Sequence, residues 1–199
     1  MIFTDDFGIH LLQFERLSRN ILEALKHPNV IRRVRNNLTV DAAELVYKSM
    51  ILPKLDYCDF VWNNLSDTKY NQLERLQTRA ARVVLKDSSH SDIEVKNQLG
   101  WKSLFSRSTT HRIIFVFKCL NCNVSKLFTD YFVQMNHAYQ TRRNRVDLIA
   151  PKISTEISTE ISAKKSMYYK GATDFNSVPS DVKHISSLFL FNSRLVDIL

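Results

Sequence analysis

Glycine and proline are scarce in this chain, and this scarcity constrains the fold more than any other feature. The 199 residues include three glycines and four prolines. Glycine supplies the positive φ angles that tight turns need, and proline interrupts helices and sheet ladders. So few of both residues leave room for long helices. We therefore expect a mainly α fold, a helical bundle, with one small, loosely ordered β-hairpin or loop near residues 140–162.

The clearest predicted helix lies between residues 67 and 86. Apolar residues recur along it at helical spacing and form one stripe: Leu73, Leu76, Ala80 and Val84. Cations recur along a second stripe: Arg75, Arg79, Arg82 and Lys86. One face is expected to enter a core and the other to face solvent. The cations are either a solvated surface, with Glu74 and Asp87 as ion-pair partners, or a contact for nucleic-acid phosphates.

Capping and stop signals predict the other helices. Thr39 is expected to cap a helix that Pro53 ends, and Gly100 is expected just past the end of a short helix. Residues 103–120 are apolar around much of a helical circumference, which predicts burial on several sides. The remaining expected helices span 39–52, 92–99, 163–175 and 187–198.

The charge balance favours a polyanionic partner. The formal net charge is +8 and the isoelectric point is about 9.5, which suits nucleic acid or an anionic membrane surface. No segment reaches the roughly 20 apolar residues that a membrane span needs, so we expect no membrane partner. The acidic N-terminal residues do not resemble a secretory signal, and three cysteines are too few for a disulfide framework. We therefore expect an intracellular protein, nuclear or cytoplasmic.

A second basic patch lies further along the chain. Arg142, Arg143 and Arg145 are close together, with Tyr139 nearby. An exposed aromatic side chain among cations can stack on an unpaired base while the cations contact phosphates. These four residues and the four cations of the second stripe are the candidate nucleic-acid-binding residues.

Four short motifs follow one another along the chain. Residues 45–58 read LVYKSMILPKLDYC, residues 73–83 read LERLQTRAARV and residues 99–104 read LGWKSL. The last motif, within residues 168–179, reads YYKGA and then FNSVP. In order and spacing, these motifs resemble the region that follows the polymerase palm in jockey-like LINE-type (non-LTR) retrotransposon reverse transcriptases.

The resemblance covers about residues 31–199, and residues 1–30 do not match what precedes this region in the family. Phe175 stands where the family usually has tryptophan, and the STEI duplication at 154–161 is an addition. The resemblance implies a helical thumb-like domain over 31–134, followed by a basic loop or hairpin and C-terminal helices over 135–199. It also implies a template–primer duplex of RNA and/or DNA, or a missing palm domain, as partner.

These observations predict a fragment of an RNA-directed DNA polymerase that binds nucleic acid without catalysing a reaction by itself. Phe3-Thr4-Asp5-Asp6 is similar to the family's catalytic box, but two-metal nucleotidyl transfer needs a further carboxylate from an upstream strand. We therefore expect no catalytic residue and no cofactor. The alternative is a helical protein-interaction module or a non-functional relic of a mobile element.

The Cys119-x-x-Cys122 spacing is found in some zinc sites. A structural zinc site needs four ligands, usually as a second close pair of cysteines or histidines. His111, His137 and Cys58 are the only other candidates, and none of them forms a paired spacing. We therefore expect two free thiols and no metal site.

Overall fold

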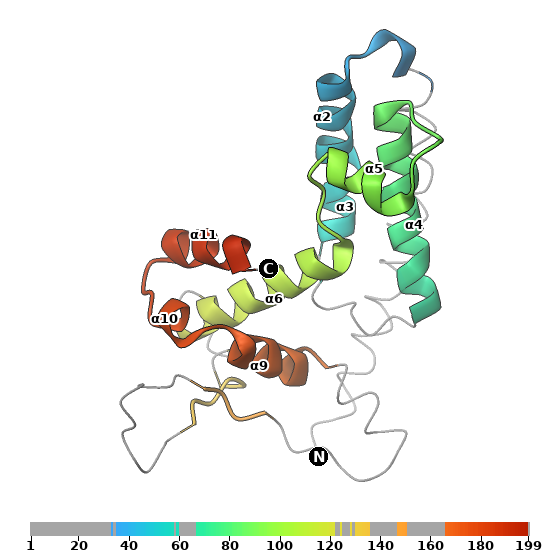
Figure 1. Cartoon of the computed structure of the whole chain (residues 1–199). Coiled ribbons are helices and arrows are strands. Elements are labelled where there is room, and N and C mark those ends of the chain that lie inside the picture. The colour runs from blue at the N-terminus through green and yellow to red at the C-terminus, as the bar shows by residue number, and fades with distance from the viewer. Residues whose placement is uncertain are drawn as a thin grey trace. The chain divides into compact units, whose positions relative to one another are not determined.

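The computed structural model is mainly α-helical, as predicted, and forms two compact units (Figure 1). The first unit ends at Leu104 and the second begins at Phe105. The structure describes residues 33, 35–57, 59, 67–121, 124, 128, 130–135, 147–150 and 166–198. Its helices are η1 (Arg35–Asn37), α2 (Val40–Met50), α3 (Leu52–Asp56), α4 (Asp67–Leu85), α5 (Asp92–Gln98), α6 (Leu104–Leu120), α9 (Met167–Ser177), α10 (Ser180–Lys183) and α11 (Leu188–Ile198).

The first unit is built around one apolar cluster shared by α2, α3 and α4. The predicted apolar stripe of α4 is buried in it, with Leu73, Leu76, Ala80 and Val84 at most 2% exposed. The other buried members come from α2, α3, the residue between them and the first residue of α6: Ala43, Tyr47, Ile51, Leu55 and Leu104. The helical period thus places one face of α4 in the core.

The predicted cap of α2 is confirmed, and Pro53 has an additional role. The side chain of Thr39 accepts a hydrogen bond from the amide of Ala42 at the start of α2. Pro53 lies in the first turn of α3, directly after α2 ends. Proline is compatible with a first helical turn, where an amide would lack an intrahelical partner. The residue that stops α2 therefore also begins a short helix.

The expected helix after α4 is also present, with stronger capping than predicted. Ser91 and Glu94 form a reciprocal capping box at the start of α5. Gly100 follows this helix with φ of 63°. This left-handed conformation costs glycine little, because glycine has no Cβ. Trp101 then stacks on Tyr47, with ring centroids 3.9 Å apart. The turn between α5 and α6 is thereby fixed onto the first core.

The second unit has its own core, formed by α6 and the C-terminal helices. Its buried residues include Ile113, Val116 and Phe117 of α6, Ala172 and Phe175 of α9, and Phe191 and Leu195 of α11. Phe117 and Phe191 stack with ring centroids 4.0 Å apart. Most of α6 belongs to this second core, and the boundary between the two units falls between residues 104 and 105. That boundary lies within the span 31–134 that the resemblance implies as one thumb-like domain.

Gly171 permits a close approach within this second core. A Cβ added there would lie 3.1 Å from the Val116 side chain and 3.2 Å from that of Phe132. Both distances are tighter than ordinary van der Waals contact, so a larger residue would displace its neighbours. The glycine of the YYKGA motif therefore has a packing role.

The predicted hairpin region lies mostly outside the described residues. Within the described part, Gln134 and Leu148 form one isolated antiparallel bridge. Residues 136–146 and 151–165, which include the STEI duplication, lie outside it. Of the helices that the structure describes, none is long and apolar enough to cross a membrane.

Candidate nucleic-acid interface

The predicted basic stripe of α4 lies on the face opposite its buried residues. Arg75, Arg79 and Lys86 are exposed, and Arg82 is half-buried. Arg75, Arg79 and Lys86 form neither an ion pair nor a side-chain hydrogen bond within the described part of the chain. From Arg75 to Lys86 the helix rises about 16 Å, at 1.5 Å per residue. We define these four cations as the α4 stripe.

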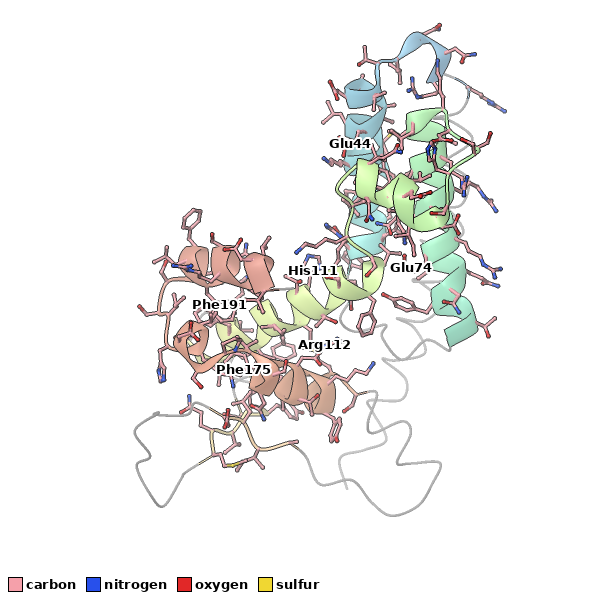
Figure 2. The ribbon with its side chains drawn as sticks, in the orientation of Figure 1. Glu44, Glu74, His111, Arg112, Phe175 and Phe191 are labelled. Carbon is pink, nitrogen blue, oxygen red and sulfur yellow. The ribbon has the colours of Figure 1, made fainter. Side chains whose placement is uncertain are left out.

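Glu74 and Asp87, the carboxylates beside the α4 stripe in the sequence, bind other groups. Glu74 accepts hydrogen bonds from the Leu104 amide at 2.7 Å and from the Lys96 ammonium at 3.2 Å. It therefore joins α4 to the elements packed on its inner side (Figure 2). Asp87 binds the amide and the hydroxyl of Ser89, both at 2.8 Å. The stripe consequently keeps most of its positive charge.

Two carboxylates after α4, Asp87 in the turn and Glu94 in the first turn of α5, are also held in their ionised form. The amide of Ser89 is the main cause that lowers the pKa of Asp87 below its usual range, and His90 adds to the effect. The amide of Ser91 is likewise the main cause that lowers the pKa of Glu94. Hydrogen bonds from backbone amides favour the charged form of a carboxyl group. These two carboxylates therefore bind local backbone amides rather than the cations of α4.

Arg82 is the member of the stripe with a structural partner. Its guanidinium donates to the carboxylate of Asp92 at 2.7 Å and to the carbonyl of His90 at 2.9 Å. It thus spans the turn that leads to α5. Its charge is partly compensated by Asp92, although that carboxylate is itself largely exposed. Arg82 is therefore a weaker candidate for phosphate binding than Arg75 and Arg79.

Lys86 occupies a position that glycine usually fills. Its φ is 57°, in the left-handed region. The Lys86 amide donates to the carbonyl of Val83, and the Asp87 amide donates to the carbonyl of Arg82. This is the hydrogen-bond pattern of a Schellman motif, in which the residue after the helix is left-handed. A lysine there carries a conformational cost of about 1 kcal/mol or more and adds a cation at the negative end of the helix dipole.

Arg35 was not predicted to have a role at this end of α4. It is buried, and its guanidinium donates to the carbonyls of Val83 and Val84 at 2.6–3.1 Å. It also binds the carbonyl of Leu38. The last carbonyls of a helix lack intrahelical donors. Arg35 supplies donors to the Val84 carbonyl and adds one to the Val83 carbonyl, which also accepts from the Lys86 amide. The sequence shows only a cluster of arginines near residue 33, which does not reveal which one folds inward.

The second predicted patch lies outside the described residues. Tyr139, Arg142, Arg143 and Arg145 all belong to residues 136–146. The residues on either side of this segment are described. The amide of Met135 donates to the carbonyl of Asp147 at 2.7 Å, so the two residues that flank the segment are hydrogen-bonded to each other.

The cysteine and aspartate motifs that the sequence singled out do not form a described site. Cys119 is buried, has a free thiol and has its pKa raised by burial to about 11. Cys122 and Cys58 lie outside the described residues, as do Asp5 and Asp6 of the acidic box. A buried thiol with a raised pKa is a poor metal ligand and nucleophile, because the thiolate is the reactive form.

The α4 stripe is therefore the candidate site that both the sequence and the described residues support as a charged surface. Its three unpaired cations lie on one face of α4 and directly after its end, and no aromatic residue lies among them. Such a surface recognises phosphates rather than base edges. Comparison of the chain with protein-family models, with curated proteins and with solved structures gives no match.

Proposed function

We propose that this chain binds nucleic acid through phosphate contacts of the α4 stripe. The observation that carries the proposal is the set of three exposed cations, Arg75, Arg79 and Lys86, without ion-pair partners among the described residues. Unpaired cations on one helix face attract a polyanion and release its condensed counterions on binding. The net charge of the whole chain, +8, acts in the same direction at longer range.

The resemblance to LINE-type reverse transcriptases supports a more specific form of this proposal. In that form the chain is a thumb-like part of an RNA-directed DNA polymerase and contacts the template–primer backbone, whereas catalysis requires a palm domain. The motif LERLQTRAARV, on which the resemblance partly depends, contains three of the four cations of the α4 stripe. Recognition would then be independent of base sequence, since phosphates and sugars carry little sequence information.

The experiment measures affinity for a fluorescein-labelled RNA–DNA hybrid duplex as a function of salt. Each phosphate contact contributes about −0.9 to the slope of log affinity against log salt on duplex DNA. Three or four contacts should therefore weaken binding on the order of a hundredfold between about 50 and 200 mM salt. Replacing Arg75 and Arg79 by alanine should flatten the slope by about two units and weaken all sequences alike.

Arg75 and Arg79 are the better pair to change because Arg82 also holds the turn to Asp92. The matched control replaces Lys48 and Arg194, which removes the same net charge from exposed positions elsewhere. It should leave the slope near the wild-type value. If the Arg75 and Arg79 variant keeps its helix content and its salt slope, the α4 stripe is only solvated surface.

An observation in the second unit favours the alternative, a protein-interaction module. α11 carries exposed apolar side chains, with Phe189 81% exposed and Leu190 and Val196 about half exposed, interspersed with exposed Asn192, Ser193, Arg194 and Asp197. Exposed apolar patches on soluble domains mark interaction surfaces when they are large and contiguous. This alternative predicts no nucleic-acid binding and no dependence of function on the α4 stripe, so the same salt titration separates the two.

A further inference from the structure

Two short extended segments pair antiparallel at the side of the second core. Backbone hydrogen bonds hold them together, from the Met135 amide to the Asp147 carbonyl at 2.7 Å and from the Ile149 amide to the Val133 carbonyl at 2.9 Å. An isolated pair of this kind is barely stable in water, so contacts with further elements matter to it. We call the six residues involved the strand pair: 133–135 and 147–149.

The centre of the strand pair directs backbone groups to two opposite edges. Gln134 and Leu148 face each other between the two hydrogen bonds. In an antiparallel pair of this type, the N–H and C=O groups of both residues point away from the partner strand. The strand pair therefore has one edge at Leu148 and another at Gln134.

The edge at Leu148 is covered by a side chain. The side-chain oxygen of Asn176 accepts from the Leu148 amide at 2.8 Å, and its side-chain nitrogen donates to the Leu148 carbonyl at 2.9 Å. Asn176 thus takes the place of a neighbouring strand on this side. Leu148 is fully buried, and its backbone groups would be costly to leave unpaired.

The edge at Gln134 is open. Gln134 is exposed, and within the part of the chain that the structure describes neither its amide nor its carbonyl forms a hydrogen bond. Natural sheets protect such edges with charged side chains, proline or a covering element. Residues 131–135 contain no charged residue and no proline. The open edge can therefore accept another strand without repelling it.

The face of the strand pair that adjoins the open edge is apolar. Side chains alternate between the two faces of a strand, so Val133, Met135 and Ile149 lie on the face opposite Leu148. They are 54%, 41% and 47% exposed, whereas Leu148 is buried in the second core. A further strand at the open edge would cover part of this apolar face.

We propose that two copies of this chain pair through the open edge, antiparallel, with Gln134 opposite Gln134 of the second copy. In this register each Gln134 amide donates to the Gln134 carbonyl of the other copy, so the open groups of both chains are satisfied. Val133 of each copy faces Met135 of the other, which forms two apolar cross-strand pairs. The same short edge thus complements itself about a two-fold axis, which favours a second copy as its occupant.

The small size of this contact sets the strength of the dimer. Standard interfaces contain roughly 20–30 residues a side, whereas this edge offers residues 133–135 and Ile149. Each chain also carries a net charge of +8, so two copies repel each other at long range. The dissociation constant should be on the order of 100 μM. Added salt should strengthen the dimer by screening the repulsion, whereas it weakens binding to nucleic acid.

Sedimentation velocity and hydrogen exchange of the full chain, without nucleic acid, test the proposal. Protein concentrations from about 10 to 500 μM bracket the expected dissociation constant. The weight-average sedimentation coefficient should rise with concentration, and exchange of the Gln134 amide should slow with it. The amides of Met135 and Ile149 already bond within one chain and should be protected at the lowest concentration. A chain that stays monomeric throughout would overturn the proposal.

Gln134→Pro removes the open donor and leaves the bonds within one chain in place. Both hydrogen bonds between the copies use a Gln134 amide, and each neutral hydrogen bond contributes about fivefold to an equilibrium constant, so the dimer should weaken about thirtyfold. Proline is tolerated on an edge strand. Protection of the Met135 and Ile149 amides reports whether the strand pair is intact. Dimerisation at the wild-type level with that protection retained would refute the open edge as the interface.

Two charged variants test the register and do not depend on proline being tolerated. Val133→Lys and Met135→Glu each replace one side of both apolar pairs and should weaken the dimer about fivefold to tenfold. A mixture of the two variants should dimerise more strongly than either alone, because the introduced lysine of one copy faces the introduced glutamate of the other. A mixture that is no better than the single variants would show that this register is wrong. The matched control, Ile93→Lys, adds the same charge at an exposed apolar residue of the first unit and should leave dimerisation unchanged.

Other occupants of the edge would give different results. A synthetic peptide of alternating valine and threonine is added in excess to the monomeric chain at low concentration. If it protects the Gln134 amide while the pure protein never dimerises, the edge binds a strand of another protein and pairing of two copies is refuted. Dimerisation that Val133→Lys does not weaken would place the contact on another surface and equally refute the proposal. None of these measurements involves nucleic acid, so the α4 stripe is judged separately by its own titration.

Discussion

The buried ion pair between Arg112 and Asp174 predicts an asymmetric response to mutation. The guanidinium Nε of Arg112, on α6 (Figure 2), donates to Asp174 Oδ2 at 2.6 Å, and the pair joins α6 to α9. The Arg112 side chain is 2% exposed, whereas that of Asp174 is 27% exposed. Water can reach the Asp174 carboxylate once Arg112 is replaced, whereas the buried Arg112 guanidinium loses its contact with the Asp174 carboxylate in Asp174→Ala and keeps contacts such as that to the Thr109 hydroxyl at 3.2 Å. Asp174→Ala should therefore destabilise the second unit more than Arg112→Met does.

The loss of unfolding free energy in each variant depends on whether the remaining charged partner is buried or exposed. Breaking a buried pair by removing one partner costs about 3–5 kcal/mol, because an uncompensated charge stays behind. The partial exposure of Asp174 places the cost of Asp174→Ala near 3 kcal/mol, at the lower end of that approximate range. Arg112→Met keeps the apolar volume of the aliphatic part of the arginine side chain and leaves the Asp174 carboxylate, which water can solvate. Its cost should therefore be about 1 kcal/mol.

Urea unfolding followed by far-ultraviolet circular dichroism measures this difference. With a slope of about 2 kcal/mol per molar urea, Asp174→Ala should lower the midpoint by about 1.5 M and Arg112→Met by about 0.5 M. Hydrogen exchange should rise first in α6 and α9, and the exchange of α4 should stay as in the wild type. Equal midpoint shifts, or a larger shift for Arg112→Met, would refute the reasoning that exposure decides the cost.

Three further predictions concern the end of α4 and the buried thiol. Lys86→Gly should raise stability by about 0.5 kcal/mol, because glycine accepts the left-handed conformation, and should flatten the salt slope by about one unit. Arg35→Met should cost about 1–3 kcal/mol, since it removes the donor of the buried Val84 carbonyl, as urea unfolding would show. Cys119 should react slowly with iodoacetamide at pH 8 in a chain with Cys58 and Cys122 replaced by serine, because its pKa is raised from 9.0 to about 11.

Each of these predictions has a contrary result. A loss of stability in Lys86→Gly would mean that the lysine side chain stabilises the helix end more than its φ angle strains it. If Arg35→Met unfolds like the wild type, water must replace the guanidinium at the α4 carbonyls. Alkylation of Cys119 as fast in the folded chain as in urea would mean that the thiol is not buried. The raised pKa also makes the free energy of unfolding depend on pH. The contribution of the protonated Cys119 thiol is fully present below pH 9.0 and is lost as pH rises through about 11.

The sequence alone was sufficient to predict the helices that carry local signals. Thr39 and Gly100 marked helix ends because a cap and a left-handed turn depend on residues within one helical turn. The two faces of α4 were predictable for the same reason, since the positions of Leu76 and Arg79 on the helix follow from its period. The helical period by itself therefore assigns the cations of the α4 stripe to the solvent-facing side.

Only the tertiary structure decided which polar residues pair across the chain. Under one of the two alternatives Glu74 was an ion-pair partner of the α4 stripe, but it binds Lys96 and the Leu104 amide, and Arg82 pairs with Asp92. Such contacts depend on how helices separated by a turn pack together, which no local periodicity encodes. The same holds for Asn176, whose two hydrogen bonds to Leu148 join residues 28 positions apart. Helical periodicity predicts on which face of a helix a side chain lies, and tertiary packing determines which residues that side chain contacts.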